Sequence, residues 1–410
     1  MAKRVSLKSV LNTTVLVSAL GYFVDIYDLL LFGIVRVPSL KALGVPDAQL
    51  LSVGLKLINF QMAGMLVGGI LWGVLGDKKG RISVLFGSIL LYSLANLANA
   101  YVTSVEMYAV LRFLAGVGLA GELGAAITLV SEVLPKESRG YGTAIVAGVG
   151  ITGAVAAAWV GEHYSWQTAY LVGGVLGLAL LIARLSIFES GMFESIKKKS
   201  VKRGQFFQLF TSRDRFFRYL WSILIGVPVW FMIGILVTFS PELTREMNVD
   251  GVVLAGKAIM YCYAGLSLGD FASGIASQYF RTRRKVVMLF LLMSVLVTLV
   301  YVFTKGWSVG GFYFLCALIG FASGYWCVFV TMAAENFGTN LRATVTTTVP
   351  NFVRGSLVLV TLLFQWIHRE IGASLLMSAL GVGVICFSLA FWSILSLKET
   401  HGKDLDYLES

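Results

Sequence analysis

The sequence predicts an all-α membrane protein in which twelve spanning helices form two pseudo-symmetric six-helix bundles. Of its 410 residues, 57% are hydrophobic and only 13% are charged, which is more apolar surface than a soluble core could use. Apolar windows of about 20 residues recur along the chain, and each is predicted to be a helix because lipid offers the backbone no hydrogen-bond partners. A rare polar pattern returns about two hundred residues later, which indicates a duplication.

The twelve helices can be placed to within about four residues at each end. The first six are predicted near 11–36, 50–76, 82–102, 106–133, 141–160 and 166–188. The second six are predicted near 218–240, 252–280, 286–304, 308–333, 343–367 and 371–397. The first bundle then covers 1–188, a basic cytoplasmic linker 189–217, the second bundle 218–398 and a cytoplasmic tail 399–410.

The repeated pattern is a lysine inside an apolar stretch, a glycine seventeen residues later, and then a glutamate and an arginine seven residues apart. Its two copies are Lys56, Gly73, Glu132 and Arg139, and then Lys257, Gly274, Glu335 and Arg342. Two homologous bundles can rock against each other about a site between them. The duplication therefore predicts a secondary transporter that works by alternating access.

Lysine and arginine gather on alternate loops, such as 78–81, 197–203 and 281–285. By the positive-inside rule both termini are expected to be cytoplasmic, in a multi-pass protein of the cell's inner (plasma) membrane. The same loops account for the net charge of +11, so the lipid bilayer is the expected partner and nucleic acid is not. We expect a monomer.

Other function classes find little support in the sequence. It has no nucleotide-binding phosphate loop, no catalytic triad and no cluster of metal ligands, so neither an enzyme nor a metal or organic cofactor is expected. The four cysteines lie inside predicted spans without metal-ligand spacing. A receptor of the same architecture would be expected to carry a soluble output domain, and the short tail after Lys398 offers none.

Several motifs occur in one order along the whole chain and resemble those of the major facilitator superfamily. They are the loop signature at 73–81, the fourth-helix motif at 112–118, the segments 131–140 and 335–342, and the tail 399–405. The last three resemble the sugar-porter branch and its relatives, which include metabolite:proton, aromatic-acid:proton and phosphate:proton symporters. The resemblance implies the major facilitator fold and transport of a small molecule.

Charged residues at the predicted cytoplasmic surface are candidates for gating. They are Asp77, Arg81, Glu132, Arg139, Glu335 and Arg342. A carboxylate beside basic residues can accept charge-assisted hydrogen bonds and can cap a neighbouring helix, which would lock one conformation. The alternative is that these residues only satisfy surface charge and topology.

A charge at bilayer depth costs several kcal/mol, so it normally survives only in a cavity or a pair. Asp25 and Asp28 project from one face of the first helix, and Arg112 and Glu122 lie on the fourth. The resemblance implies that Asp28 and Arg112 form the proton switch, with Asp25 or Glu122 assisting. A static ion pair that only holds the first bundle together is the alternative.

Arg354 falls near the middle of a predicted span, where its guanidinium could grip a carboxylate or phosphate. Alternatively, it pairs with an acid such as Glu122. Three aromatic residues are further substrate-binding candidates, which could stack on an organic substrate or only pack: Tyr27, Tyr325 and Trp326. Two lysines could attract an anion or only extend to the lipid headgroups: Lys56 and Lys257.

Together these residues predict proton-coupled symport, in the uptake direction, of a small organic anion or a zwitterionic metabolite. The proton is the coupling ion. The alternative function is a proton-driven exporter, or an uncoupled facilitator of a neutral solute such as a sugar or nucleoside.

Overall fold

The computed structural model describes residues 12–79, 81–122, 124, 126, 129–130, 134, 139–184 and 206–402. Within that part the chain is almost wholly helical, and strand-like pairing is confined to one isolated bridge between Asp250 and Ser308. The gating candidate Glu132 and the side chains of Asp77, Arg81 and Arg139 lie outside the described residues.

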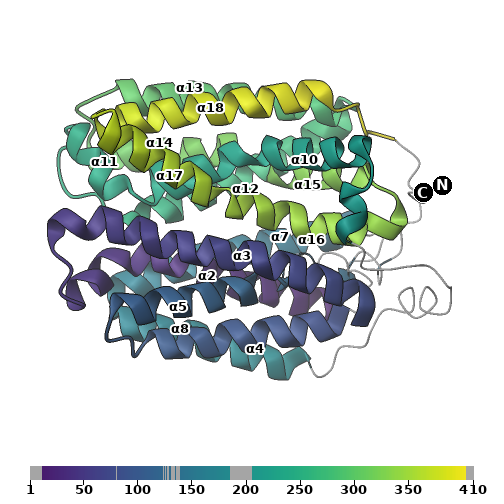
Figure 1. Ribbon diagram of the computed structural model, residues 1–410, viewed down its shortest axis with the longest axis horizontal. Coiled ribbons are helices and arrows are strands. Elements are labelled where there is room, and N and C mark those ends of the chain that lie inside the picture. The colour runs from purple at the N-terminus through teal and green to yellow at the C-terminus, as the bar shows by residue number, and fades with distance from the viewer. Residues whose placement is uncertain are drawn as a thin grey trace.

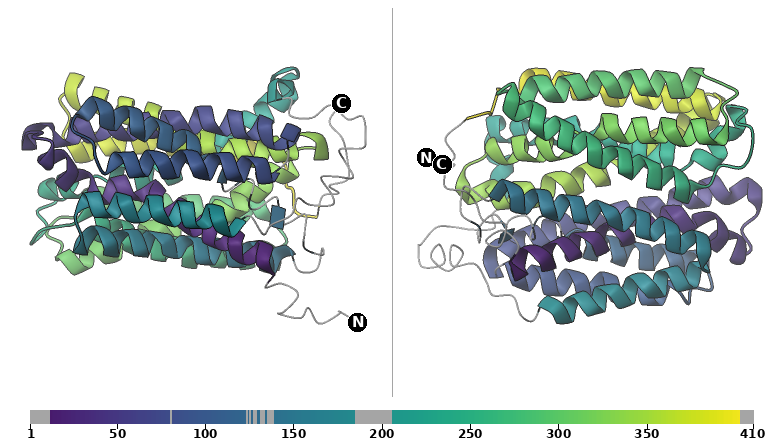
Figure 2. Two further views of the ribbon diagram at one scale, coloured as in Figure 1. Left: turned by 90° about the horizontal axis from the view of Figure 1, so that it is seen from below. Right: turned by 180° about the vertical axis from the view of Figure 1, so that it is seen from behind.

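The helices of the two halves form two groups that lie side by side (Figures 1 and 2). The first half contains α2 (Thr13–Ala42), η1 (Asp47–Gln49), α3 (Leu50–Lys79), α4 (Arg81–Asn99), α5 (Val105–Leu119), α7 (Arg139–His163) and α8 (Trp166–Ala183). The second half contains η3 (Phe206–Phe210), α10 (Arg213–Phe231), η4 (Met232–Val237), α11 (Ser240–Glu246), α12 (Ala255–Tyr279), α13 (Arg283–Phe303), α14 (Val309–Ser323), α15 (Trp326–Glu335), α16 (Thr339–Gly355), α17 (Leu357–Glu370) and α18 (Leu375–Ser396).

A described helix overlaps each of the twelve predicted spans. Eight helical stretches in the described ranges are long and apolar enough to cross a membrane by length and composition. The shorter α5 has 15 residues, and α12 carries Lys257 and Asp270 among glycines and serines. The predicted all-α membrane fold is confirmed. The helices that differ most from a simple apolar span, such as α5 and α12, carry polar groups or end at a break.

Glycines let the second and fourth helices of each half touch backbone to backbone. A Cβ added at Gly64 or Gly116 would overlap a carbonyl oxygen across the α3–α5 contact, and one at Gly265 or Gly320 would do the same across α12–α14. Helices in lipid associate through such close packing. Lipid tails are as apolar as the side chains, so the hydrophobic effect does not drive the helices together. The same crossing occurs in both halves, as a duplication requires.

The fourth helix of each half also breaks at corresponding positions. In the first half α5 ends at Leu119 and a turn follows at Gly121. In the second half α14 ends at Ser323, and α15 begins after Gly324. A side chain at Gly324 would collide with the backbone of Gly269, so the break sits where two backbones meet. The spans predicted from the sequence, 106–133 and 308–333, were unbroken helices, so the two breaks correct that prediction.

Replacing Gly265 by alanine should weaken the second bundle. The new Cβ would overlap the carbonyl oxygen of Ala317, so α12 and α14 would have to separate, at a cost of about 1–3 kcal/mol. The measurement is the thermal unfolding midpoint of the purified protein in detergent. Gly274→Ala is the matched control on α12, because nothing lies within 4 Å of a Cβ there. Equal midpoints for the two variants would contradict this account of the crossing.

Candidate functional site

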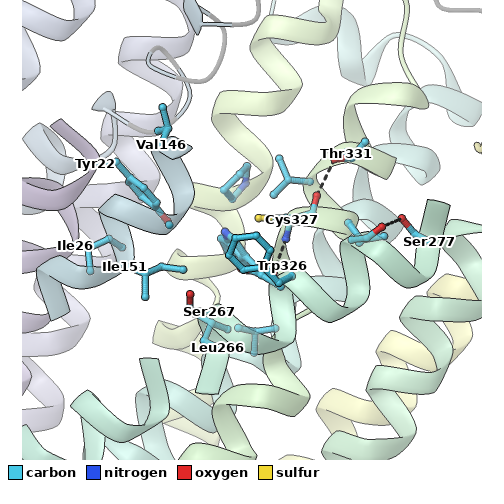
Figure 3. Close-up of a pocket in the computed structure, with 18 of the residues that line it drawn as sticks. Tyr22, Ile26, Val146, Ile151, Leu266, Ser267, Ser277, Trp326, Cys327 and Thr331 are labelled. Atoms are coloured by element: carbon cyan, nitrogen blue, oxygen red, sulfur yellow. Dashed lines mark hydrogen bonds between the residues drawn. The ribbon is translucent and has the colours of Figure 1, made fainter. Parts of the chain in front are cut away.

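A cavity of about 540 Å³ lies between the two halves of the chain. Tyr22, Ile26 and Ile151 line it from α2 and α7, and Trp326 faces them from α15 (Figure 3). Its wall is mostly apolar and aromatic, with a few polar groups, as is typical of small-molecule sites. Both halves therefore contribute to one site.

The cavity reaches one end of the molecule, where the exposed Gln278 and the half-buried Arg283 line it. We call this end the mouth. Arg283 makes a bidentate ion pair with Glu335, with both N–O distances at 2.8 Å. Glu335 and Arg342 are both gating candidates, and the Arg342 guanidinium donates to the backbone oxygens of Ala334 and Phe337. In the second half these two residues anchor a helix end at the mouth.

Glu399, just after α18, also fixes the mouth. Its carboxylate accepts hydrogen bonds from the Thr282 hydroxyl and from the backbone N–H groups of Arg283 and Arg284. Burial alone would raise the pKa of Glu399, but these bonds outweigh it and lower the pKa to about 2. The carboxylate therefore stays ionised at any physiological pH and caps the start of α13.

Arg354 is a buried cation in the cavity wall. It is 2% exposed, and its guanidinium lies 6.0 Å from the ring centre of Trp230 and 5.9 Å from that of Trp326. No described carboxylate forms an ion pair with it, and its Nε has no hydrogen-bond partner. The two indoles flank a cation whose remaining donors can take an anion.

Glu122 pairs with Arg184 rather than with Arg354. Nη1 of Arg184 lies 3.2 Å from Oε2 of Glu122, Nη2 bonds the other oxygen, and both side chains are fully buried. Gly21 on α2 leaves the room for this pair, because a Cβ there would overlap both charged groups. Arg184 is a charge inside the predicted span 166–188, but it is not among the site residues predicted from the sequence. Glu122, the alternative partner predicted for Arg354, is therefore already paired.

The two acids of α2 are buried without partners. Asp25 and Asp28 are both 0% exposed, and none of their carboxylate oxygens has a hydrogen-bond partner in the described part of the chain. Asp25 is one turn from cavity-lining Tyr22 and interacts electrostatically with Arg354. Asp28 instead faces α8, beside Gly173. The two carboxylates therefore have different surroundings, although they are three residues apart.

Asp28 and Arg112 share one buried region but are not in contact as an ion pair. Arg112 lies over the rings of Phe32 and Tyr170, at 5.5 Å and 5.7 Å, and its Nη1 is 3.5 Å from Oδ1 of Asn96. Its Nε and Nη2 are unpartnered among the residues described. In this conformation aromatic rings, not Asp28, are the neighbours of the guanidinium.

Four of the substrate-binding candidates do not line the cavity. Tyr27 and Tyr325 are fully buried and donate to the backbone oxygens of Ala169 and Ile225, both at 2.9 Å, so they act in packing here. Lys56 is exposed away from the cavity. Only Trp326 and Arg354 of the predicted set belong to its wall.

Lys257 is the fourth, and it helps to close the opposite end of the molecule. Its Nζ lies 2.9 Å from Glu162 of α7, a half-exposed ion pair between the two halves. A buried pair lies nearby in the same role, because Arg36 of α2 binds Glu242 of α11 bidentately at 2.6 Å and 2.9 Å. We call this the closed end; α11 marks it at the left of Figure 1.

Arg36 is held from several sides at the closed end. Its guanidinium lies 4.4 Å from the ring centre of Phe239, its Nη1 is 3.4 Å from the Leu50 carbonyl oxygen, and Gly54 leaves room for its stem. The side chain is 0% exposed. Sequence reasoning missed both Arg36 and Glu242, because their places at the ends of predicted spans resembled topology signals.

The fold and the site define a class of protein. Two repeated helical halves enclose one cavity that is shut at one end by ion pairs between the halves, which is the arrangement of a secondary transporter. A model of the Major Facilitator Superfamily matches residues 10–355. The chain belongs to this superfamily, and it is a multi-pass membrane transporter rather than an enzyme.

Curated relatives transport several small molecules. The chain is 29% identical over 185 residues to the niacin transporter NiaP of Acinetobacter baylyi, an alignment that covers 43% of this chain and 40% of that one. It is 30% identical over 194 residues to the 4-hydroxybenzoate transporter PcaK of Pseudomonas putida, covering 46% and 42%. It is 30% identical over 197 residues to the sialic acid transporter NanX of Escherichia coli, covering 47% of each. The alignments thus span less than half of each relative.

A solved structure extends the likeness to the whole fold. The proton:xylose symporter XylE, bound to 6-bromo-6-deoxy-D-glucose, superposes with a TM-score of 0.73 over 97% of this chain and 98% of its own. The sequence identity is 15%. The agreement concerns the fold.

Replacing Glu242 by glutamine should destabilise the closed end. Arg36 would stay buried without its counter-ion, and breaking a buried pair costs about 3–5 kcal/mol. Conformations open at that end should then become more populated. Cys327 reports the change, because it is exposed and lines the cavity while the other three cysteines are buried. Maleimide labelling of Cys327 from the mouth side should slow.

The control for this experiment is Asp47→Asn. Asp47 pairs with Lys41 through exposed side chains, and such surface pairs contribute little. Its labelling rate should equal that of the unmodified protein. An unchanged rate in the Glu242 variant would show that the buried pair does not hold this end shut.

Proposed function

We propose that this transporter carries an aromatic monocarboxylate, and that Arg354 holds the carboxylate. The observation that supports this most directly is the buried cation without an acid partner, flanked by Trp230 and Trp326 in the cavity wall. A guanidinium can bind a carboxylate through two parallel hydrogen bonds, and the indole faces offer stacking area to a planar ring. The names of the relatives NiaP and PcaK, which are transporters of niacin and 4-hydroxybenzoate, agree with this substrate class.

We further propose that transport is uptake coupled to protons. Asp25 and Asp28 support this, because a buried carboxylate with no partner is most easily accommodated when it carries a proton. Asp25 interacts electrostatically with Arg354 and with the Glu122–Arg184 pair, so a substrate anion at Arg354 would alter its electrostatic surroundings. Asp28 and Arg112 are likewise fully buried, and neither lines the cavity. Protonation of Asp25 and binding of a substrate anion at Arg354 would then affect each other through electrostatic interaction.

We also propose a membrane location, an orientation and bundle boundaries for the chain. The positive-inside pattern supports a plasma-membrane location with the mouth and both termini on the cytoplasmic side. The bundle boundaries at 1–188 and 218–398, with a linker between them, agree with the helix order. In this orientation the conformation described is open to the cytoplasm, which is the state that releases substrate during uptake.

Arg354→Ala should weaken binding of an aromatic monocarboxylate roughly ten- to a hundredfold, because charge-assisted hydrogen bonds contribute about 1.5–3 kcal/mol. The measurement is ligand-induced stabilisation of the purified protein by benzoate, nicotinate, xylose and a nucleoside. Arg369→Ala, an exposed arginine on α17, is the control. Stabilisation by the neutral solutes alone, unchanged in the Arg354 variant, would replace the anion hypothesis with transport of a neutral solute.

Asp28→Asn should abolish accumulation of substrate driven by a proton gradient but preserve exchange between equal substrate pools, because the amide cannot release a proton while the cavity stays intact. Transport of labelled benzoate into proteoliposomes measures both. Glu106→Gln removes an exposed acid at the start of α5 and should change neither. Loss of exchange together with accumulation would assign Asp28 a role in folding or binding.

A further inference from the structure

Asp270 is a carboxylate in the cavity wall that has no part in the proposed anion binding or proton coupling. It lies on α12, near the middle of the predicted span 252–280, and lines the same cavity as Arg354. Its Oδ1 accepts a hydrogen bond from the backbone N–H of Cys327 at 3.0 Å. The carboxylate thus meets the first turn of α15, where the broken fourth helix of the second half restarts.

Four described acids of the two halves have cationic partners, whereas Asp25 and Asp28 of α2 have no hydrogen-bond partner. Glu122 pairs with Arg184, Glu242 with Arg36, Glu335 with Arg283 and Glu162 with Lys257. Asp270 is held by a backbone N–H instead, and no described lysine or arginine forms an ion pair with it. A helix N-terminus balances only part of a full negative charge. When Asp270 is ionised, the cavity wall therefore carries a negative group as well as the positive Arg354.

Trp326 stands between these two charges. Its ring centre is 5.9 Å from the Arg354 guanidinium, and the backbone N–H of the next residue, Cys327, bonds to Asp270. Arg354 and Asp270 do not pair with each other, although both face the same cavity. A substrate stacked beside this indole would have a cation near one side and an anion near another. The wall is bipolar, with an aromatic surface at its centre.

We infer that Asp270 sets the charge selectivity of the site: it rejects aromatic dicarboxylates and favours rings that carry a positive or hydrogen-donating group at another ring position. The inference rests on the proposed function, because it takes Arg354 as the anchor of the carboxylate. Like charges in a cavity of low dielectric repel strongly, and specificity often comes from such a repulsive element as much as from attraction. A second carboxylate on the ring would meet this repulsion, whereas a ring cation would be attracted.

A cap of α15 is the other role that the same hydrogen bond could serve, and two substitutions separate the roles. Asp270→Asn keeps an oxygen that accepts from Cys327 N–H but removes the charge. Asp270→Ala removes both. If the residue were only a cap, asparagine would behave like aspartate, and alanine would lower the thermal unfolding midpoint without changing selectivity.

The test measures dissociation constants of three probes of similar shape for the purified full-length protein. The probes are benzoate, the dianion isophthalate and the zwitterion N-methylnicotinate. In the unmodified protein, isophthalate should bind at least about tenfold more weakly than benzoate, and N-methylnicotinate should bind as well or better. In Asp270→Asn, the isophthalate deficit should shrink about tenfold and N-methylnicotinate should lose about tenfold, while benzoate changes little.

Opposite changes for the dianion and the zwitterion identify a charge effect, because a change of cavity shape would move both probes in the same direction. Asp47→Asn, which removes an exposed acid at the closed end, should leave all three constants unchanged. Equal probe ratios in the unmodified protein and Asp270→Asn would overturn the inference while the proposed function stands. Failure of the unmodified protein to bind benzoate would overturn the proposed function, and the inference with it. Normal binding of benzoate with much weaker binding of N-methylnicotinate would overturn the inference alone.

Discussion

The structure is organised by the cost of leaving a charge unpaired in an apolar interior. Among the described buried ions, Glu122 pairs with Arg184 and Arg36 with Glu242. Asp25, Asp28, Arg112 and Arg354 form no ion pair, and they lie in the first half of the chain or in the cavity wall. Because an unpaired charge at this depth persists only where something else compensates it, the unpaired groups mark where a substrate ion or a proton is expected. The paired groups mark where the protein holds its own halves together.

The duplication explains how such a site can be exposed to each side in turn. Within each half, glycine contacts such as Gly64 on Phe113 and Gly265 on Ala317 join the second and fourth helices at backbone distance. Contacts of that kind resist sliding, so each half can move as a unit. Between the halves, the closed end is bridged by the Arg36–Glu242 and Lys257–Glu162 ion pairs, together with side-chain contacts such as Ile34 beside Gly256. Ion pairs between the halves can break without disturbing the packing inside each half, which is a mechanical condition for alternating access.

Sequence patterns located the helices well and the partners poorly. Span positions, the repeat and the class of protein follow from hydrophobicity and spacing, which are properties of one chain segment at a time. Pairing depends on which face of a helix meets which neighbour, and a break near Gly121 or Gly324 changes that face. Tyr27 is an example: it is as aromatic and as central as Tyr22, yet it donates to a backbone oxygen of α8 while Tyr22 lines the cavity. Arg184 and Asp270 escaped notice for the same reason, since their importance lies in their neighbours.

A ligand can shift a conformational equilibrium only by binding one state better than another. Opening the closed end requires breaking the buried Arg36–Glu242 pair, whose loss costs several kcal/mol if nothing replaces it. A substrate held by Arg354 and the indoles alone would touch one half and could not offset that cost. The cavity wall also includes Tyr22 and Ile151 from the first half, so a ring of moderate size can contact both halves at once. Bridging of the two halves by a substrate would therefore link occupancy of the cavity to release of the ion pair at its far end.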